Sequence, residues 1–204
     1  MNSTIIYDLV KNSRDTLDYI SNGFSGPAPA YIKFLVLKKY SNNIGDWIET
    51  GTYEGSMTNR LRKITNKIVI SFEPSEFYYK KSLKRLKIFN NVKVMNSTSE
   101  DALAKVVNEV GRVVNFWLDG HFSDKKTFGK KSFCPLREEL DIISKIYIHE
   151  KEVTIFIDDI RLCSNLQSRD MAYPSIKYLI SWADKYGFEY IVESDILILK
   201  KISK

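Results

Sequence analysis

The sequence predicts an α/β protein with a largely parallel central sheet and helices on both of its faces. From Trp47 onward, short apolar runs alternate with stretches of helical periodicity, which is the pattern of strands joined by crossover helices. A turn spaced by Gly51 and Gly55 follows the first apolar run, and acidic residues follow several later ones. These observations place the chemistry at the carboxyl ends of the strands, where open parallel sheets bind their ligands.

The N-terminal part of the chain is predicted to form a helical cap. Residues 3–20 carry apolar side chains roughly on one helical face, and residues 31–40 return to helical spacing. Between them, residues 22–29 contain two glycines and two prolines, which break the chain into a loop. These segments are too short to bury a core alone, so we expect residues 1–44 to cap a core formed by residues 45–204.

Beyond the cap, strands and helices are predicted in alternation. The first predicted strand ends at 47–48, and the next four span 67–72, 92–95, 113–118 and 153–157. The predicted helices span 56–63, 75–89, 99–110, 135–147 and 176–186. Residues 188–193 and 196–200 flank Ser194 and Asp195 and predict a terminal antiparallel hairpin. Five parallel strands and this hairpin make seven strands.

Length and composition bound the remaining possibilities. A chain of 204 residues with 44% apolar content has room for one sizeable core, so one domain is expected over residues 1–204. No run approaches 18 apolar residues, and the N-terminus lacks the apolar region of a signal peptide, so a cytoplasmic protein is expected. Cys134 and Cys163 lie far apart without CxxC spacing, which argues against a zinc site or a disulfide framework.

The net charge of +6 raises the alternatives of nucleic acid or an anionic sugar nucleotide or glycan as partner. The lysines are spread along the chain and mixed with aromatic residues, without an RNP, zinc-finger or helix-turn-helix pattern. A solvated basic surface is therefore favoured over a dedicated nucleic-acid face. We expect a small-molecule or glycan acceptor and no membrane, with a homo-oligomer left open.

The stretch Glu49-x-Gly51-x-x-x-Gly55 predicts the end of a strand, followed by a ligand-facing loop and a helix. Glycine is needed where a backbone turns tightly off a strand or approaches a ligand closely, because no Cβ fits there. Tyr53 occupies the middle glycine position of the dinucleotide-binding pattern, so a phosphate cradle is a poor match. The stretch resembles motif I of class I S-adenosylmethionine (SAM)-dependent methyltransferases, whose acidic residue sits beneath the methionine end of the cofactor.

Acidic residues recur at the predicted strand ends, namely Glu49, Glu73, Asp119, Asp158 and Asp159. All five are expected to meet at one edge of the sheet. Glu73, after the second strand, suits the two hydroxyls of a ribose. The alternative is an acid favoured by the dipole of the following helix, which would explain Glu73 but not the series.

The cluster of Asp119, Asp158 and Asp159 suggests a metal site. Carboxylate oxygens are hard ligands suited to Mg²⁺ or Ca²⁺, and a magnesium site commonly uses a few of them with water and substrate. Without a cation, the three carboxylates would repel one another and would need raised pKa values or basic partners. Arg161 and Lys125 are such partners in this alternative.

Four further stretches carry a more specific resemblance. They are FWLDGHFS at Phe116 to Ser123, FIDDIRL at Phe156 to Leu162, Tyr173-Pro174-Ser175, and the terminal SDILIL. Over about residues 28 to 200 the chain is similar to macrocin-type O-methyltransferases of antibiotic sugars. The resemblance implies a Rossmann-like class I methyltransferase sheet of seven strands whose last strand is antiparallel. It also implies Mg²⁺ on Asp119, Asp158 and Asp159.

The resemblance assigns further roles. In the family an acidic general base stands two places after the first metal aspartate, and this chain has His121 there. His121 is chemically competent as base, as ligand or as a side chain packed behind the loop. Asp119 and His121 are the expected catalytic residues. The expected cofactor residues are Glu49, Thr50, Gly51, Thr52, Tyr53, Gly55, Ser56, Glu73, Pro74, Ser97, Thr98, Ser99 and Asp119.

The function favoured by these patterns is SAM-dependent O-methylation of a hydroxyl on a sugar, glycan or small glycosylated metabolite, with Mg²⁺ as a second cofactor. One alternative is a SAM-binding protein of the same fold that performs no transfer. Another, less favoured, is RNA methylation, which fits the positive charge but lacks the asparagine-proline motif of base N-methyltransferases. The sequence does not identify the acceptor.

Overall fold

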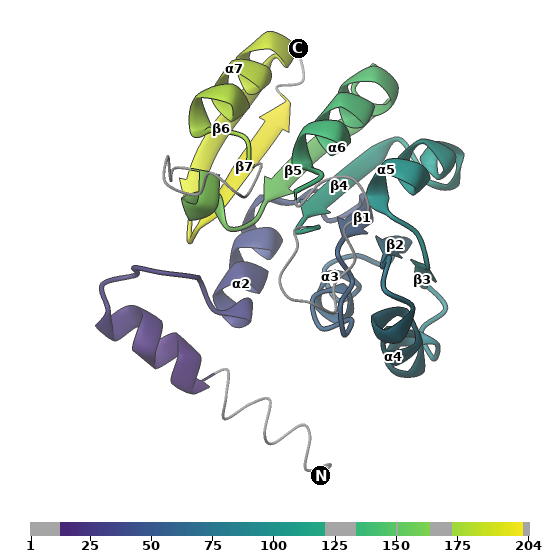
Figure 1. Ribbon diagram of the computed structural model, residues 1–204, viewed down its shortest axis with the longest axis horizontal. Helices are drawn as coiled ribbons and strands as arrows, with labels where there is room; N and C mark the ends of the chain where they lie inside the picture. Colours follow the sequence, from purple (N-terminus) through teal and green to yellow (C-terminus); the bar gives the residue numbers. More distant parts are fainter. Residues whose placement is uncertain (1–12, 121–133, 150, 164–172, 202–204) are drawn as a thin grey trace.

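The computed structural model describes residues 13–120, 134–149, 151–163 and 173–201. Its centre is a seven-stranded sheet in the order β3-β2-β1-β4-β5-β7-β6, which confirms the predicted sheet (Figure 1). Strands β1 to β5 pair in parallel, and β7 runs antiparallel to both β5 and β6. The strand bounds are β1 Asp46–Thr50, β2 Val69–Phe72, β3 Val92–Met95, β4 Val113–Leu118, β5 Glu152–Ile157, β6 Phe188–Glu193 and β7 Ile196–Lys201.

Helices cover both faces of the sheet, with α5, α6 and α7 on one side and α2, α3 and α4 on the other (Figure 1). Each face has its own apolar core, because successive side chains of a strand point to opposite faces. In β1, Ile48 packs with α5, α6 and α7, whereas Trp47 packs with α2 and α3. The helix bounds are α2 Ala30–Tyr40, α3 Thr58–Leu61, α4 Glu76–Leu86, α5 Ser99–Ala102, α6 Leu136–Ile142 and α7 Ile176–Tyr186.

Strand β1 lies in the middle of the parallel part of the sheet and is fixed by polar contacts at its start. It pairs with β2 on one side and with β4 on the other. The buried Asp46 carboxylate accepts hydrogen bonds from the Ile68 N–H at 3.0 Å and the Gly111 N–H at 2.6 Å. Charge-assisted bonds of this kind fix the register with which β1 enters the sheet.

The predicted elements exist, but several boundaries differ. Glu49 was expected to follow the first strand, whereas it lies inside β1, because its backbone pairs with Ser71 and Trp117 on the neighbouring strands. The helix predicted over 56–63 is a single turn, α3. The segment predicted as one helix over 99–110 is α5 followed by two 3₁₀ turns, Leu103–Lys105 and Val107–Glu109.

Cap chemistry decides where other helices begin and end. The Thr98 hydroxyl accepts a hydrogen bond from the Asp101 N–H, and the Ser175 hydroxyl caps α7 in the same way. Gly187 ends α7 in the left-handed conformation. Helix α6 continues as a π-helical turn, Ile143–Tyr147, within the helix predicted over 135–147.

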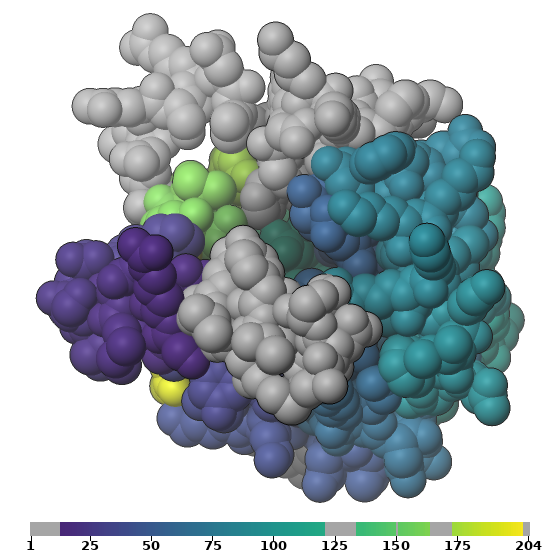
Figure 2. Space-filling model, turned by 90° about the horizontal axis from the view of Figure 1, so that it is seen from below, coloured from purple at the N-terminus to yellow at the C-terminus, as the bar shows by residue number. Residues whose placement is uncertain are grey.

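The described part of the N-terminal cap contains two helical segments, joined by a non-helical stretch over residues 22–29. Residues 13–21 are helical, and the earlier part of the helix predicted over 3–20 lies outside the described residues. Helix α2 buries Val36 and Leu37 against the sheet, while Leu35 is 42% exposed. In Figure 2 the purple cap residues lie on one side of the visible face and the blue to teal residues that follow β1 on the other.

At its C-terminal end, α2 is tied to the terminal hairpin. Lys39 Nζ and the Tyr40 hydroxyl both donate to Glu193 Oε2, at 2.8 and 2.6 Å, and Glu193 is the last residue of β6. In the part of the chain that the structure describes, no helix has the length and apolar character needed to cross a membrane.

Gly51, directly after β1, is predicted to be intolerant of any side chain. Its φ is +84°, and a Cβ there would lie 2.4 Å from the carbonyl oxygen of Asp119. Gly187 is a matched control, because its φ is +71° but a Cβ would meet nothing within 4 Å. In urea unfolding, Gly187→Ala should cost about 1–2 kcal/mol for its conformation alone. Gly51→Ala should cost a further ~1–3 kcal/mol for the overlap, and equal losses would contradict this account.

Candidate functional site

The carboxylate of Glu73, directly after β2, accepts hydrogen bonds from two backbone N–H groups, one of them in the loop after β1. The Tyr53 N–H donates to Glu73 Oε2 at 2.6 Å, and the Ser75 N–H donates to Glu73 Oε1 at 2.9 Å. Tyr53 adopts a φ of 49°, which is uncommon outside glycine. Burial raises the pKa of Glu73, and the two N–H donors oppose that shift. The carboxylate is thereby held in one orientation at the end of β2.

Glu49 lies in β1, two residues before Gly51, and faces α3. It is fully buried, and its Oε2 accepts hydrogen bonds from the hydroxyls of Thr58 at 2.5 Å and Ser71 at 2.7 Å. Burial raises its pKa to about 8, although the two hydroxyls favour the charged form. Its Oε1 has no hydrogen-bond partner among the described residues, so this buried oxygen is the one that remains for a cofactor.

The other expected cofactor residues lie around the ends of β1, β2 and β3, but not all face outward. Thr52 is buried, with its hydroxyl 2.5 Å from that of Ser71, and the Ser56 hydroxyl accepts from Arg60 at 2.8 Å. Pro74 and Ser97 sit at the ends of β2 and β3, where Asn96 bridges to the carbonyl oxygens of Glu73 and Pro74. The buried Thr50 and Ser99 face Glu139.

The three predicted metal aspartates do come together. Asp119 follows β4, and Asp158 and Asp159 follow β5, so the parallel pairing of these strands brings them to one edge. Each offers an oxygen within 4.8 Å of the others. Asp159 adopts a φ of 54°, and its N–H donates to Asp158 Oδ1 at 2.8 Å. The left-handed backbone at Asp159 thus turns two consecutive carboxylates toward the same place.

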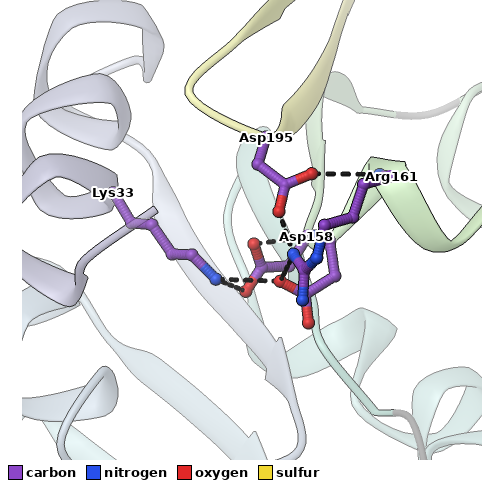
Figure 3. A network of polar contacts seen from close by, with 5 residues as sticks. Lys33, Asp158, Arg161 and Asp195 are labelled. Carbon is purple, nitrogen blue, oxygen red and sulfur yellow. Dashed lines mark hydrogen bonds and ion pairs between the residues drawn. The ribbon is translucent and has the colours of Figure 1, made fainter. Parts of the chain in front are cut away.

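Two cations of the chain itself reach this cluster (Figure 3). Lys33, from α2, places its Nζ 2.5 Å from Asp158 Oδ2 and 3.2 Å from Asp159 Oδ1. Arg161 donates to Asp159 Oδ1 at 2.7 Å and also binds Asp195, in the turn between β6 and β7. The contact with Asp159 confirms Arg161 as a basic partner of the aspartates. The sequence alone does not predict the contacts of Lys33.

These contacts shift the pKa values in opposite directions. Burial alone would lower the pKa of Lys33, but the charges of Asp158, Asp119 and Asp159 outweigh it and raise the pKa. Burial and the nearby Asp119 raise the pKa of Asp158 despite its ion pair with Lys33. Burial would also raise the pKa of Asp159, but Arg161 and Lys33 lower it. Among the described residues, Lys33 contacts Asp158 and Asp159, and Arg161 contacts Asp159 and Asp195.

The donor set fits a divalent cation in one respect and resists it in another. Three carboxylates of suitable spacing are the ligands that Mg²⁺ prefers. However, the Lys33 ammonium already stands against two of the three carboxylates. The residues present thus fit a metal ion provided that Lys33 can move.

Glu139, on α6, is a candidate site residue that the sequence analysis missed. Its side chain is buried, and it lines a small pocket with Asp119, Asp158 and Tyr173 at the ends of β4 and β5. Burial raises its pKa to about 7, opposed by the hydroxyls of Ser99 and Thr50. Its Oε1 has no hydrogen-bond partner among the described residues. The signal that could have found it is its place on the apolar face of α6 with Leu136 and Leu140.

Some predicted site residues cannot be placed. His121 and Lys125 lie outside the described residues. The roles predicted for them therefore remain predictions. Tyr173 is placed, and it lines the same pocket as Glu139. Burial raises the pKa of its hydroxyl.

Solved structures with the same arrangement of strands and helices share a fold with this chain. An rRNA methylase from Streptococcus thermophilus is 20% identical over 88% of this chain and 98% of its own length, with a TM-score of 0.52. The chain has the fold of class I SAM-dependent methyltransferases. A precorrin-6y C5,15-methyltransferase from Geobacter metallireducens gives a TM-score of 0.54 at 13% identity, covering 83% of this chain and 86% of that one.

A third similar structure contains S-adenosylhomocysteine, the molecule that SAM becomes when it gives up its methyl group. It is a provisionally assigned methyltransferase from Streptococcus mutans in complex with S-adenosylhomocysteine, 15% identical over 87% of this chain and 100% of that chain, with a TM-score of 0.54. No protein-family model matches the chain, and no curated protein matches it. At these identities the likeness establishes the fold and not the macrocin-type subfamily.

Glu139 gives the stability of the protein a predictable pH dependence. Its pKa rises from 4.5 to about 7 on folding, so the folded state binds more protons between these values, and the free energy of unfolding falls as pH rises through this window. Glu139→Gln removes this titration. Between pH 4.5 and 7.5, wild type should therefore lose up to ~3 kcal/mol more than the variant.

The measurement is urea unfolding at several pH values. Glu138→Gln is the matched control, because Glu138 is the exposed neighbour of Glu139 on the same helix. The control should retain the pH slope of the wild type. Parallel profiles for wild type and Glu139→Gln would show that folding does not shift the pKa of Glu139, and would contradict this account.

Proposed function

We propose that this chain transfers a methyl group from SAM to a hydroxyl of a sugar, glycan or small glycosylated metabolite, with Mg²⁺ at Asp119, Asp158 and Asp159. The observation that carries the proposal is the meeting, at one edge of a methyltransferase-type sheet, of a fixed carboxylate at Glu73 and a cluster of three aspartates. The former suits a nucleoside and the latter suits a polyhydroxyl acceptor.

The cofactor would be held by the first half of the sheet. Glu73 would accept the ribose hydroxyls through the lone pairs that its two N–H donors leave available. The glycine at position 51 lets the loop lie against the carbonyl of Asp119, with the orphan oxygen of Glu49 beneath it. Residues 97–99 would border the adenine. Bound SAM supplies an electrophilic methyl group, and these residues fix its direction.

The acceptor would be held by the second half. Asp119, Asp158 and Asp159 would orient vicinal hydroxyls, and Mg²⁺ would supply a charge that lowers the pKa of the reacting hydroxyl. His121, two places after Asp119 in the chain, is the proposed acceptor of the proton. Much of the rate enhancement would come from holding the nucleophilic oxygen in line with the methyl group, which is the contribution of these rigid strand ends.

The alternatives are weaker on the described residues. A protein that only bound SAM would not need a cluster of three aspartates beside the cofactor site. Some structures of this fold are named as rRNA methylases, but at 20% identity or less that likeness concerns the fold alone. An acidic cluster at the acceptor side would repel a nucleic-acid backbone, and this favours a neutral or metal-binding acceptor.

The cofactor site is tested by calorimetry with SAM. Glu73→Gln keeps the shape of the side chain but removes the charge that accepts hydrogen bonds from the ribose and from two backbone N–H groups. Its affinity for SAM should fall by about 10- to 100-fold, since hydrogen bonds to charged groups contribute ~1.5–3 kcal/mol. Glu76→Gln, an exposed neighbour on α4 that pairs with Lys80, is the control and should bind normally. A wild-type protein that takes up no SAM at millimolar concentration would refute the proposal.

The acceptor site is tested with methyl-labelled SAM and a panel of sugar nucleotides, glycosides and RNA, with and without Mg²⁺. Asp158→Asn should abolish labelling of the hydroxyl acceptor and leave SAM affinity within about twofold, because Asp158 belongs to the acceptor side. Asp184→Asn, an exposed aspartate on α7, is the control. Label recovered only in RNA would replace the proposal with the RNA-methylase alternative.

A further inference from the structure

Lys33 is bound to the carboxylates that the proposed metal ion would need. Its Nζ lies 2.5 Å from Asp158 Oδ2 and 3.2 Å from Asp159 Oδ1, and Asp119 adds to the field that keeps it charged. Mg²⁺ approaches carboxylate oxygens to about 2.0–2.1 Å. A divalent ion among these aspartates would therefore stand within a few ångströms of the ammonium group. Like charges at that separation in a partly buried site repel strongly.

Of the two basic side chains, Lys33 is the one that can leave. Arg161 bridges Asp159 and Asp195, and its position just after β5 keeps it close to the cluster even if one contact changes. Lys33 sits on a flexible four-carbon stem in the first turns of α2, a helix that is held to the sheet through Val36 and Leu37. The Lys33 side chain can thus swing out while α2 stays in place.

We propose that Lys33 and a divalent cation compete for the aspartate cluster, so that Lys33 sets the metal affinity of the acceptor site. The inference rests on the metal site of the proposed function, but not on the identity of the acceptor. With Lys33 in place, the carboxylates have a counter-ion and the site keeps its shape without metal. When a divalent ion binds, it replaces the ammonium as the partner of Asp158, and Lys33 turns toward solvent.

Competition of this kind is reciprocal. If Lys33 weakens metal binding, then metal must weaken the docking of Lys33 by the same factor, because the two equilibria share one cycle. The apparent dissociation constant of the metal equals the intrinsic constant divided by the fraction of molecules in which Lys33 has left the site. Removing the charge of Lys33 should remove this penalty, and adding metal should expose Lys33. The two effects can be measured independently.

The first experiment titrates the full-length chain with Mn²⁺ and follows the free ion by electron paramagnetic resonance. Lys33→Met keeps the length of the stem and removes the charge. It should bind Mn²⁺ at least ~10-fold more tightly than wild type, a change equivalent to ~1.4 kcal/mol. Lys38→Met is the matched control, because Lys38 is exposed on the same helix, and it should behave like wild type. Equal affinity in wild type and Lys33→Met, or no binding in either, overturns the competition.

The second experiment needs no variant and therefore does not depend on whether Lys33→Met folds. Wild type is treated briefly with an amine-acetylating reagent, with and without saturating Mg²⁺, and acetylation is measured at each lysine by mass spectrometry. Lys33, whose side chain is 12% exposed and ion-paired, should react several-fold faster with Mg²⁺ present, and Lys38 should not change. An unchanged or slower reaction at Lys33 overturns the inference.

The two ideas fail in different ways. Calorimetry with SAM on wild type reports on the proposed function and does not involve Lys33. If SAM fails to bind but Lys33→Met gains Mn²⁺ affinity, the methyltransferase proposal fails and the competition stands. If SAM binds but Lys33→Met gains no Mn²⁺ affinity, the competition fails alone.

Discussion

The repulsion among carboxylates at the carboxyl edge of the parallel sheet is the constraint on which the rest of the site depends. Parallel pairing of β4 and β5 forces Asp119, Asp158 and Asp159 together, because each follows the end of its strand. Such a cluster is unstable without positive charge. The fold supplies that charge from Lys33, on the distant helix α2, and from Arg161, two residues after Asp159. The N-terminal cap is thereby part of the site and not merely a cover for the sheet.

The same edge also contains two acids whose pKa values are raised by burial. Glu49 faces α3 on one side of the sheet, and Glu139 lies on α6 on the other side. Each leaves one oxygen without a hydrogen-bond partner among the described residues. A raised pKa reduces the negative charge that these two acids add to the edge where the aspartates lie.

The sequence alone was sufficient to predict the positions of the strands and the acidic residues at their ends, because apolar runs and the acids that end them are local signals. The sequence predicted helix lengths less well. The helix expected over 99–110 is only four residues long as α5, and 3₁₀ turns follow it. Prediction from the sequence missed Lys33 and Glu139 for a common reason. Each is an ionisable residue on the apolar face of a helix, and its partner lies on a distant segment that periodicity cannot identify.

Helix α2 is attached to the rest of the protein by interactions of two different kinds. Val36 and Leu37 make apolar contacts that ions in solution hardly affect, whereas the first turns are held through the Lys33 ion pairs. Dissolved salt weakens charge pairs to the extent that solvent reaches them and leaves apolar contacts intact. The Lys39–Glu193 pair at the C-terminal end of α2 is more exposed than the Lys33 pairs. A rise in ionic strength would therefore loosen the attachment of α2 to the terminal hairpin first, and would leave the first turns docked on the aspartates.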